Sequence, residues 1–545
     1  MGKVNSIDIL AKYDNWLNKI EDEYIIERLS ALTSDEKIEY FSNSLDFGTS
    51  GMRGIMRMGP NGINELTVSK LAKAVADYAN KHYPNGKVVV CFDTRHNSYK
   101  FSRLFANVLD MEGVACALFK EFAPTPLCVF ATTTLGACLG VMITASHNRK
   151  EYNGIKVYDH NGVSINDKIQ QEITSIFNNT DEVAVYNKVR SRKLSRKVRF
   201  IKKDMLDKFV NRVYDKTSKD LKIIYTPLNG TGLYCVKKLL KNNRFNILTP
   251  DSQSFPDGDF STCPYPNPEF IEAFDESLKL AQNTYADIII ATDPDADRLG
   301  VMVRHNNDYV KLSGNEVGYI FADYLLKDSH DKFVVTTVVT SPLIDDICKA
   351  YNARLFKTLT GFMSIGTKTK ECIELLGAGS HALSYEESCG YVLRNDYFDK
   401  DGIFACLAIC QIAQWLKNHD LTLVDYLDEI YSKIGYVADR TESIVFEGAN
   451  ASTKMQRTIE KIRNQKVDKI LNKKIIRVVD YLNDDTGLPK QNFLRYEAEE
   501  FSFILRPSGT EPKLKIYMFF KCDKVDAENK LSMLYDDIKK IFFKD

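Results

Sequence analysis

Short apolar segments rich in β-branched residues recur along the chain, and a polar loop follows each one. The segments cover residues 87–92, 139–143, 221–225, 286–291 and 501–505. The loops after them contain Gly, Ser, Thr, Asn or Asp, and helical patterns come next. Apolar runs of this length that alternate with helical patterns are typical of buried strands in largely parallel sheets. The pattern therefore predicts several similar α/β domains.

Two other features of the pattern concern the organisation of the chain. The first ~40 residues carry apolar side chains among charges in an approximately 3.6-residue rhythm, which predicts helices. Candidate seams between domains are residues 188–203, 305–308 and 436–442, which are polar or basic. Because no low-complexity linker separates these parts, we expect the domains to pack against one another.

Composition limits the classes of partner. The chain has 545 residues, of which 44% are hydrophobic and 27% charged, as is ordinary for a soluble globular protein. This length suggests about three to five domains. Lys plus Arg and Asp plus Glu both number 73, so no net charge attracts the chain to nucleic acid or to an anionic membrane. We expect a small-molecule partner, no nucleic acid and no membrane.

Cysteine spacing and the N-terminal sequence point to a cytoplasmic protein. The twelve cysteines include no C-x-x-C pair, so we expect neither a zinc site nor a disulfide framework. We find no signal-peptide pattern and no apolar run long enough to span a bilayer. Gly2 stands in a formal N-myristoylation pattern, which we attribute to chance because the pattern is so short.

The segment 286–291 leads into a loop with three carboxylates at alternate positions, Asp293, Asp295 and Asp297. Ligands of α/β sheets bind beyond the carboxyl ends of strands. Carboxylates that converge there repel one another unless a cation is present, and oxygen-only ligands suit a hard ion such as Mg²⁺. The alternative is a solvated acidic turn. The loop lacks the spacing of an EF-hand.

The segment 139–143 leads into a loop that contains Ser146, His147 and Asn148, and Lys156 follows shortly after it. A lysine near such a loop can neutralise phosphate or move a proton. No G-x-S-x-G elbow surrounds the serine, which argues against an α/β-hydrolase. The loop alone leaves a functional serine and an ordinary turn residue about equally supported.

Two further loops give weaker signals. Residues 506–513 offer a guanidinium, two hydroxyls and a glycine, a set that suits a phosphate dianion but also an ordinary turn. Glu386 and Ser388 could hydrogen-bond adjacent sugar hydroxyls, or form an exposed polar turn. Residues 361–368 have the glycine spacing of a Walker A loop but lack its Gly-Lys-Ser/Thr sequence, so no nucleotide site is predicted.

Taken together and in this order, these loops resemble the α-D-phosphohexomutase superfamily, most closely its phosphoglucomutase-2-like branch. The resemblance covers about residues 45–517 and includes the segments 47–54, 266–269 and 400–402. It implies an α/β fold of four domains around a central cleft. Three would be α/β sandwich domains with mixed sheets, and the C-terminal one a smaller α+β domain. We predict the bounds 1–200, 201–310, 311–438 and 439–545.

The resemblance also implies chemistry. The chain would interconvert glucose 1-phosphate and glucose 6-phosphate through a phosphoserine, with glucose 1,6-bisphosphate as intermediate and activator. Mg²⁺ would be held by Ser146, Asp293, Asp295 and Asp297. The catalytic residues would be Ser146, Arg53, Lys156 and His147. The sugar phosphate would be bound by Glu386, Ser388, Gly361, Arg298, Arg506, Ser508, Gly509 and Thr510.

Two departures from the family pattern keep alternatives open. Arg149 stands where relatives usually have Pro, which should alter loop stiffness more than chemistry. Met363 stands where close relatives usually have Lys, so a phosphopentomutase, a phosphomannomutase or a glucose-1,6-bisphosphate synthase remains an alternative. A catalytically silent sugar-phosphate-binding relative and a phosphatase with Asp293 as nucleophile are others. The expected assembly is a monomer or a homodimer.

Overall fold

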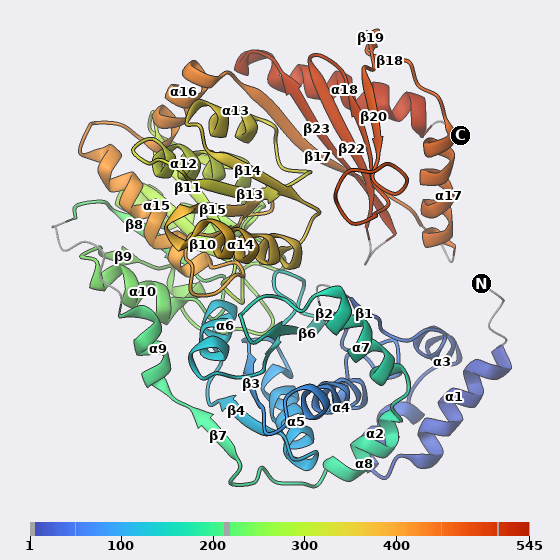
Figure 1. The fold of residues 1–545 in the computed structure, drawn as a ribbon. Helices are drawn as coiled ribbons and strands as arrows, with labels where there is room; N and C mark the ends of the chain where they lie inside the picture. Colours follow the sequence, from blue (N-terminus) through green and yellow to red (C-terminus); the bar gives the residue numbers. More distant parts are fainter. Residues whose placement is uncertain (1–5, 49–50, 212–218, 448–449, 509–511, 544–545) are drawn as a thin grey trace. The chain divides into compact units, whose positions relative to one another are not determined.

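The computed structural model describes residues 6–48, 51–211, 219–447, 450–508 and 512–543 (Figure 1). Their contacts divide the chain into two compact units. Unit 1 lies within residues 1–317 and 361–424, and unit 2 within 318–360 and 425–545. No helix among the described residues is both long and apolar enough to cross a membrane.

Unit 1 begins with the predicted helices, α1 (Ser6–Lys19), α2 (Glu23–Ser30) and α3 (Ser34–Phe41). Thr33 and Glu36 form a capping box that satisfies the first backbone N–H groups of α3. The Trp16 and Phe41 rings meet edge to face at 5.3 Å, so α1 and α3 share one small core.

A seven-stranded sheet follows, in the order β1-β2-β6-β5-β3-β4-β7. Strands β3, β4, β5 and β7 run parallel, whereas β6, β2 and β1 join antiparallel. The prediction of a largely parallel sheet is therefore wrong for the side of this sheet that β6, β2 and β1 form. The strands are β1 (Phe47–Gly48), β2 (Gly51–Ile55), β3 (Lys87–Phe92), β4 (Ala115–Phe119), β5 (Leu139–Ile143), β6 (Tyr152–Asp159) and β7 (Val198–Ile201). The helices are α4 (Glu65–His82), α5 (Ser98–Met111), α6 (Thr125–Thr134), α7 (Asp167–Asn178) and α8 (Glu182–Val189).

The second sheet of unit 1 has five strands in the order β12-β11-β10-β8-β9. Strands β9, β8 and β10 are parallel, and β11 and β12 continue antiparallel. Residues 305–308, proposed above as a seam, form the hairpin turn between β11 and β12. The strands are β8 (Ile223–Thr226), β9 (Ile247–Leu248), β10 (Ile288–Thr292), β11 (Leu299–His305) and β12 (Asp308–Leu312). The helices are α9 (Lys203–Val210), α10 (Leu233–Asn242), α11 (Asp275–Thr284) and the short 3₁₀ turns η1 (Asp251–Gln253) and η2 (Ile271–Phe274).

The remainder of unit 1 places one more hairpin beside this second sheet. It comprises α14 (Phe362–Leu376), η3 (Ala378–Ser380), β15 (His381–Glu386), β16 (Gly390–Val392) and α15 (Gly402–Lys417). Helix α15 packs against β10, β11 and β16 and so ties the hairpin to the strands that flank the aspartate loop.

All twelve cysteines of the chain are free, and eleven of them are buried.

Unit 2 contains a parallel strand pair and an antiparallel C-terminal domain. The pair is β13 (Phe333–Thr337) and β14 (Arg354–Thr358), with α13 (Leu343–Ala350) between them. Helices α12 (Gly314–Leu326) and α16 (Leu423–Ile434) each begin in unit 1 and continue in unit 2. The C-terminal elements are β17 (Val437–Val445), α17 (Ala451–Asn464), β18 (Lys469–Ile470), β19 (Lys473–Lys474), β20 (Arg477–Asp480), β21 (Leu494–Glu497), β22 (Phe501–Pro507), β23 (Lys513–Lys521), η4 (Lys524–Asp526) and α18 (Ala527–Phe542).

The C-terminal sheet has the order β17-β23-β22-β21-β20, and every neighbouring pair in it is antiparallel. Residues 501–505, taken from their pattern as part of a parallel sheet, therefore belong to an antiparallel one. Helices α17 and α18 pack against this sheet and close its apolar core. The prediction of mixed α/β sheets followed by a distinct C-terminal α+β domain is confirmed.

Candidate active site

The serine loop, residues 144–149, and the aspartate loop, residues 293–297, meet in unit 1 although they are far apart in sequence. The Ser146 hydroxyl donates to Asp293 Oδ2 at 2.6 Å, and both side chains are buried. Each loop begins at the carboxyl end of a buried strand, β5 or β10, as the sequence predicted. The structure thus brings together the two signals that were strongest in the sequence.

A residue at the start of α6 joins the two sheets at this point. Thr125 donates its backbone N–H to the carbonyl oxygen of Asp295 at 2.8 Å, and its hydroxyl to Asp295 Oδ2 at 2.7 Å. An α-helix begins with backbone N–H groups that lack intrahelical partners, so its first turn is a suitable place to receive these oxygens. The aspartate loop is therefore fixed to the first sheet by α6.

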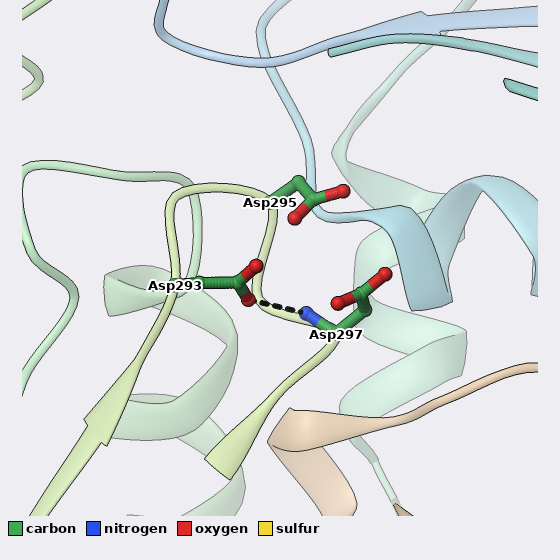
Figure 2. Close-up of side chains that lie close together, drawn as sticks. All are labelled: Asp293, Asp295 and Asp297. Carbon is green, nitrogen blue, oxygen red and sulfur yellow. Dashed lines mark hydrogen bonds between the residues drawn. The ribbon is translucent and has the colours of Figure 1, made fainter. Parts of the chain in front are cut away.

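The three aspartates form one compact cluster. Figure 2 shows their carboxylates gathered around a single turn between β10 and β11. Each can contribute one oxygen to a set whose members all lie within 4.8 Å of one another, and all three side chains are fully buried. Asp293 Oδ1 accepts the backbone N–H groups of Asp297 and Arg298, each at 3.1 Å, which orients the carboxylate inside the turn.

The cluster fits a metal ion by its donor set. Asp295 Oδ1 and Asp297 Oδ1 are buried, and neither has a hydrogen-bond partner within the described parts of the chain. A buried oxygen without a partner carries a desolvation cost that a bound cation would remove. The other oxygens of these two residues accept Lys156 Nζ, at 2.7 Å from Asp295 Oδ2 and 2.8 Å from Asp297 Oδ2. The three residues could therefore hold a cation beside the lysine.

Proton affinities within the cluster are uneven. Burial, together with the charges of Asp295 and Asp297, raises the pKa of Asp293 well above its usual value. Burial also opposes ionisation of Asp295, but the Lys156 ammonium outweighs it and lowers the pKa of that carboxyl. Burial disfavours the charged form of Lys156, yet the two carboxylates together raise the pKa of the amine. Of these carboxylates, Asp293, which lies beside Ser146, is therefore the one whose ionised form would gain most from a bound cation.

The backbone of the serine loop is strained at the serine itself. Ser146 has a φ of 50°, in the left-handed region that costs a non-glycine residue about 1–2 kcal/mol. Its N–H donates to Thr144 Oγ1 at 2.8 Å, and its Oγ lies 3.3 Å from His147 Nδ1. Burial, with the charges of Arg298 and Arg53, lowers the pKa of His147 well below its usual value.

Arg53 and Lys156 reach this loop from neighbouring strands. Arg53 lies on β2 opposite Gly154 of β6, and Lys156 lies two residues further along β6. The Arg53 Nη1 group donates to Asn148 Oδ1 at 2.9 Å. The two cations that the family resemblance singled out therefore lie on adjacent strands, one beside the serine loop and one on the aspartates.

The Glu386 turn lies next to the aspartate loop within unit 1. Arg298 forms a β-bridge with Gly390, and the backbone N–H of Leu299 donates to the Cys389 carbonyl at 3.0 Å. Burial raises the pKa of Glu386, while Lys400 and Arg298 act in the opposite direction. Ser388, two residues further on, also lowers the pKa of Glu386. Arg298 itself pairs with Glu269 through Nη1.

The other predicted substrate residues fall into two groups. Gly361, with a φ of 101°, precedes the first residue of α14, and Met363 is half-buried in the first turn of that helix. Arg506 lies next to the last residue of β22 in unit 2, where its Nη1 donates to Tyr517 Oη at 3.1 Å, and Ser508 follows the strand. Gly509 and Thr510 lie outside the described residues.

Sequence reasoning missed two side chains that touch the aspartates. Lys400 Nζ lies 3.4 Å from Asp297 Oδ2 and 4.6 Å from the centroid of the Phe362 ring. Its segment was recognised as similar to the family, but no role was assigned to the lysine. Thr125 had no signal at all, because a threonine after a proline at a helix start is common.

Comparison with known proteins places this geometry in a family. Models of the alpha/beta/alpha domains I, II and III of phosphoglucomutase/phosphomannomutase match residues 44–184, 203–306 and 313–434. A phosphoglucomutase from Staphylococcus haemolyticus is 33% identical over 534 residues, which is 94% of this chain and 97% of the relative. One from Staphylococcus aureus is 30% identical over 533 residues, 94% of this chain and 96% of the relative.

Solved structures share the fold at lower identity. A putative phosphomannomutase from Thermus thermophilus aligns with a TM-score of 0.70 at 20% identity, over 92% of this chain and 100% of that one. The open form of a Paramecium phosphoglucomutase, parafusin, aligns with a TM-score of 0.67 at 17% identity, over 92% and 97%. Together with the curated relatives, which match along almost their whole length, these findings show that the chain belongs to the phosphoglucomutase/phosphomannomutase family.

Proposed function

We propose that this chain interconverts glucose 1-phosphate and glucose 6-phosphate, with Ser146 as the carrier of the phosphoryl group. The observation that carries the proposal is the 2.6 Å contact between Ser146 Oγ and Asp293, inside a buried cluster of three carboxylates. Within the described residues, these three aspartates are the one group of acidic side chains close enough together to hold a metal ion, and Ser146 lies beside them. The curated relatives named phosphoglucomutase support the choice of substrate.

We propose Mg²⁺ as the ion of the cluster, held by Asp293, Asp295, Asp297 and an oxygen on Ser146. An all-oxygen set of carboxylates suits a hard divalent cation, and the unpartnered oxygens of Asp295 and Asp297 are available to it. When bound, such an ion neutralises negative charge on a phosphoryl group that is being transferred.

The proposed reaction has two balanced halves. The phosphorylated Ser146 first gives its phosphoryl group to O6 of glucose 1-phosphate: the Oγ–P bond breaks, the O6–P bond forms, O6 loses its proton, and Ser146 Oγ takes one up. Glucose 1,6-bisphosphate results. After this intermediate turns over, its 1-phosphoryl group moves to Ser146 Oγ: the O1–P bond breaks, the Oγ–P bond forms, Ser146 Oγ loses its proton, and O1 takes one up, which leaves glucose 6-phosphate and the phosphorylated enzyme.

Residues around Ser146 are placed to move protons and to balance charge. His147 Nδ1, at 3.3 Å from Ser146 Oγ, can hold a proton at that oxygen. Arg53 and Lys156 bring positive charge to the two loops and remain the candidates for handling the sugar hydroxyl proton. Preorganised charge of this kind is usually the largest contribution to phosphoryl-transfer catalysis.

We assign the residues that would bind the sugar and its second phosphate from the family resemblance. Glu386 and Ser388 would bind sugar hydroxyls, with Gly361 and Arg298 nearby. The non-reacting phosphate would be bound by Arg506, Ser508, Gly509 and Thr510. A guanidinium with hydroxyl and backbone donors suits a phosphate dianion, and it can accept either end of the sugar as the bisphosphate turns over.

The presence of Met363 is a reason to test other sugar phosphates as substrates. It is a neutral side chain in the first turn of α14, at the position where the family pattern has a lysine. A coupled assay should therefore compare glucose 1-phosphate, mannose 1-phosphate and ribose 1-phosphate, with and without glucose 1,6-bisphosphate. We expect the fastest turnover with glucose 1-phosphate and bisphosphate. Faster turnover of ribose 1-phosphate would reassign the chain as a phosphopentomutase.

The decisive variant is Ser146→Ala. Without the hydroxyl no phosphoryl carrier remains, and we expect kcat for glucose 1-phosphate to fall by about 10⁴-fold or more. Ser69→Ala is the matched control, because Ser69 is equally buried and its hydroxyl donates only to the Glu65 carbonyl of its own helix. Near-normal turnover by Ser146→Ala would refute the proposed mechanism.

A further inference from the structure

A buried arginine outside the predicted site makes more contacts with the serine loop than any residue named above. Arg95 follows β3 and is 3% exposed. Its Nη1 donates to the carbonyl oxygens of Arg149 at 2.8 Å and Tyr152 at 3.3 Å. Its Nη2 donates to the carbonyl oxygen of Asn148 at 2.6 Å, and also to that of Ser146. One guanidinium thus binds four carbonyl oxygens, three from the serine loop and one from the first residue of β6.

Arg95 is itself held rigidly. Its Nε lies 3.2 Å from Asp93 Oδ2, and its backbone N–H donates to Asp93 Oδ1 at 3.0 Å. Ser98 donates to the same carboxylate oxygen at 2.7 Å. The guanidinium carbon lies 4.8 Å from the centroid of the Phe260 ring, a distance typical of a cation–π contact. A planar fork between a carboxylate and an aromatic face has little freedom to move.

The Phe260 contact joins two parts of the fold. Arg95 and the serine loop lie in the region matched by the domain I model, and Phe260 lies in the region matched by the domain II model, which also contains the aspartate loop. Two side-chain contacts reinforce the connection: Asp259 lies 3.1 Å from Lys150 Nζ and 3.3 Å from His96 Nε2. The anchor of the serine loop is therefore tied to the region that carries the aspartates.

The serine loop needs such an anchor. Ser146 has a left-handed backbone, and residues 144–151 belong to no strand or helix. Four carbonyl oxygens that point to one buried place would repel one another without a multivalent donor. A misplacement of about 1 Å in a reacting group can lower a rate roughly 100-fold.

We propose that Arg95 is a positioning residue that sets the place of the Ser146 hydroxyl relative to the three aspartates. The proposal assigns Arg95 no contact with substrate. It acts through the backbone of residues 146–152, and Phe260 makes its position depend on the region of the aspartate loop. The catalytic part of this inference rests on the proposed function, whereas the effect on the loop itself does not.

The test uses Arg95→Lys in the full chain, because lysine keeps the charge but cannot span four carbonyl oxygens. We expect kcat for glucose 1-phosphate to fall roughly tenfold to 100-fold while KM changes less than about threefold. Hydrogen exchange should become faster at the amides of Asn148 and Tyr152, which now donate to Ala145 and Arg149. Phe260→Leu is a milder variant, with smaller changes of the same kind, in case Arg95→Lys folds poorly.

Arg394→Lys is the matched control. Arg394 is 7% exposed, lies 5.3 Å from the centroid of the Tyr397 ring, and donates to Asp396 at 2.9 and 2.6 Å. Its replacement should lower the melting temperature without changing kcat of the folded protein or exchange in residues 146–152. The inference is overturned if Arg95→Lys and Arg394→Lys have the same kcat and the same exchange at those residues.

Failure of the proposed function would look different. If the wild-type chain converts none of the sugar phosphates, the proposed function fails, and hydrogen exchange alone decides the role of Arg95. Faster exchange confined to residues 146–152 in Arg95→Lys then supports the anchor. Exchange unchanged at those residues refutes it, whatever the activity of the wild type.

Discussion

The aspartate loop and the serine loop meet at one point, but different interactions hold them. The aspartate loop joins two paired strands, β10 and β11, and Asp293 accepts N–H groups of its own turn. Its unmet requirement is positive charge, which Lys156 supplies only in part. The serine loop has a strained backbone and depends on Arg95, which lies far earlier in the sequence.

This difference separates two kinds of effect that a mutation can have on the same site. The backbone of the aspartate loop is held by two paired strands, by N–H groups of its own turn and by Thr125, so substitutions of the aspartates should change charge and metal binding while the backbone stays in place. The serine loop is held in place by Arg95, which lies outside the loop. Substitutions that affect this contact should therefore change the position of Ser146 more than the charge around it. Each of the following experiments sharpens or breaks that distinction.

Among these experiments, the largest effect is expected from Asp295→Asn. The amide keeps the size of the side chain but removes a proposed metal ligand and a partner of Lys156. We expect kcat/KM to fall by about 1,000-fold or more, which corresponds to about 4 kcal/mol of transition-state stabilisation. Asp323→Asn is the control, because Asp323 is 4% exposed and its carboxylate accepts hydrogen bonds from the hydroxyls of Tyr351 and Tyr426 in unit 2. Equal losses in the two variants would contradict a metal role for Asp295.

Lys156→Met should reduce the stability of the metal-free protein. Removal of the ammonium leaves buried Asp295 without its lysine partner and buried Asp297 with Lys400 alone, and breaking a buried ion pair costs about 3–5 kcal/mol. Lys70→Met is matched in exposure, since both lysine side chains are 13% exposed, and Lys70 pairs with Glu182 at 2.9 Å. Denaturant unfolding without metal should show a clearly larger loss for Lys156→Met. A loss no greater than that of Lys70→Met would mean that the cluster does not need the lysine.

Addition of Mg²⁺ should stabilise the wild-type chain. A ligand that binds only the folded state at about 100 times its Kd raises the free energy of unfolding by about 2.7 kcal/mol. We expect this rise in melting experiments on the wild type and its loss in an Asp295→Asn, Asp297→Asn double variant. Addition of EDTA should reverse the rise. The same Mg²⁺ effect in the double variant would place the ion elsewhere on the protein.

The smallest effect is expected from Arg149→Ala. The Arg149 guanidinium lies 5.3 Å from the centroid of the Tyr265 ring, a contact worth about 0.5–1 kcal/mol at an exposed site. Arg95 binds the carbonyl group of residue 149 and not its side chain, so the anchor survives the substitution. Activity should stay within about threefold of wild type, because less than ~1 kcal/mol of loop stability is lost. A loss as large as that of Arg95→Lys would show that the side chain, and not the backbone, positions the loop.

The strand-end rule predicted where each of the two loops begins, whereas their meeting was implied only by the family resemblance. The sequence did not predict strand direction. Strand β11, with its first five residues buried, has the same unbroken apolar pattern as β10, although it runs antiparallel to it. Burial on both faces gives the same pattern in either direction. The mixed character of the sheets entered only through the family resemblance.

The residues that position the site could not be predicted from the sequence either. Thr125 and Arg95 act on backbone carbonyl oxygens, and Thr125 in addition on a carboxylate 170 positions away. A backbone acceptor has no residue type, so no motif records such a contact. Lys400 was different: its segment had been singled out, but its distance from Asp297 follows only from the fold.

The most direct test of the central claim is to find which residue carries the phosphoryl group. The wild-type chain is incubated with Mg²⁺ and glucose 1,6-bisphosphate, quenched, digested and analysed by peptide mass spectrometry. We predict one phosphoryl group on the peptide that contains Ser146, and none there in Ser146→Ala. A phosphoryl group on Asp293, or an unmodified Ser146 in a preparation that turns over substrate, would contradict the account.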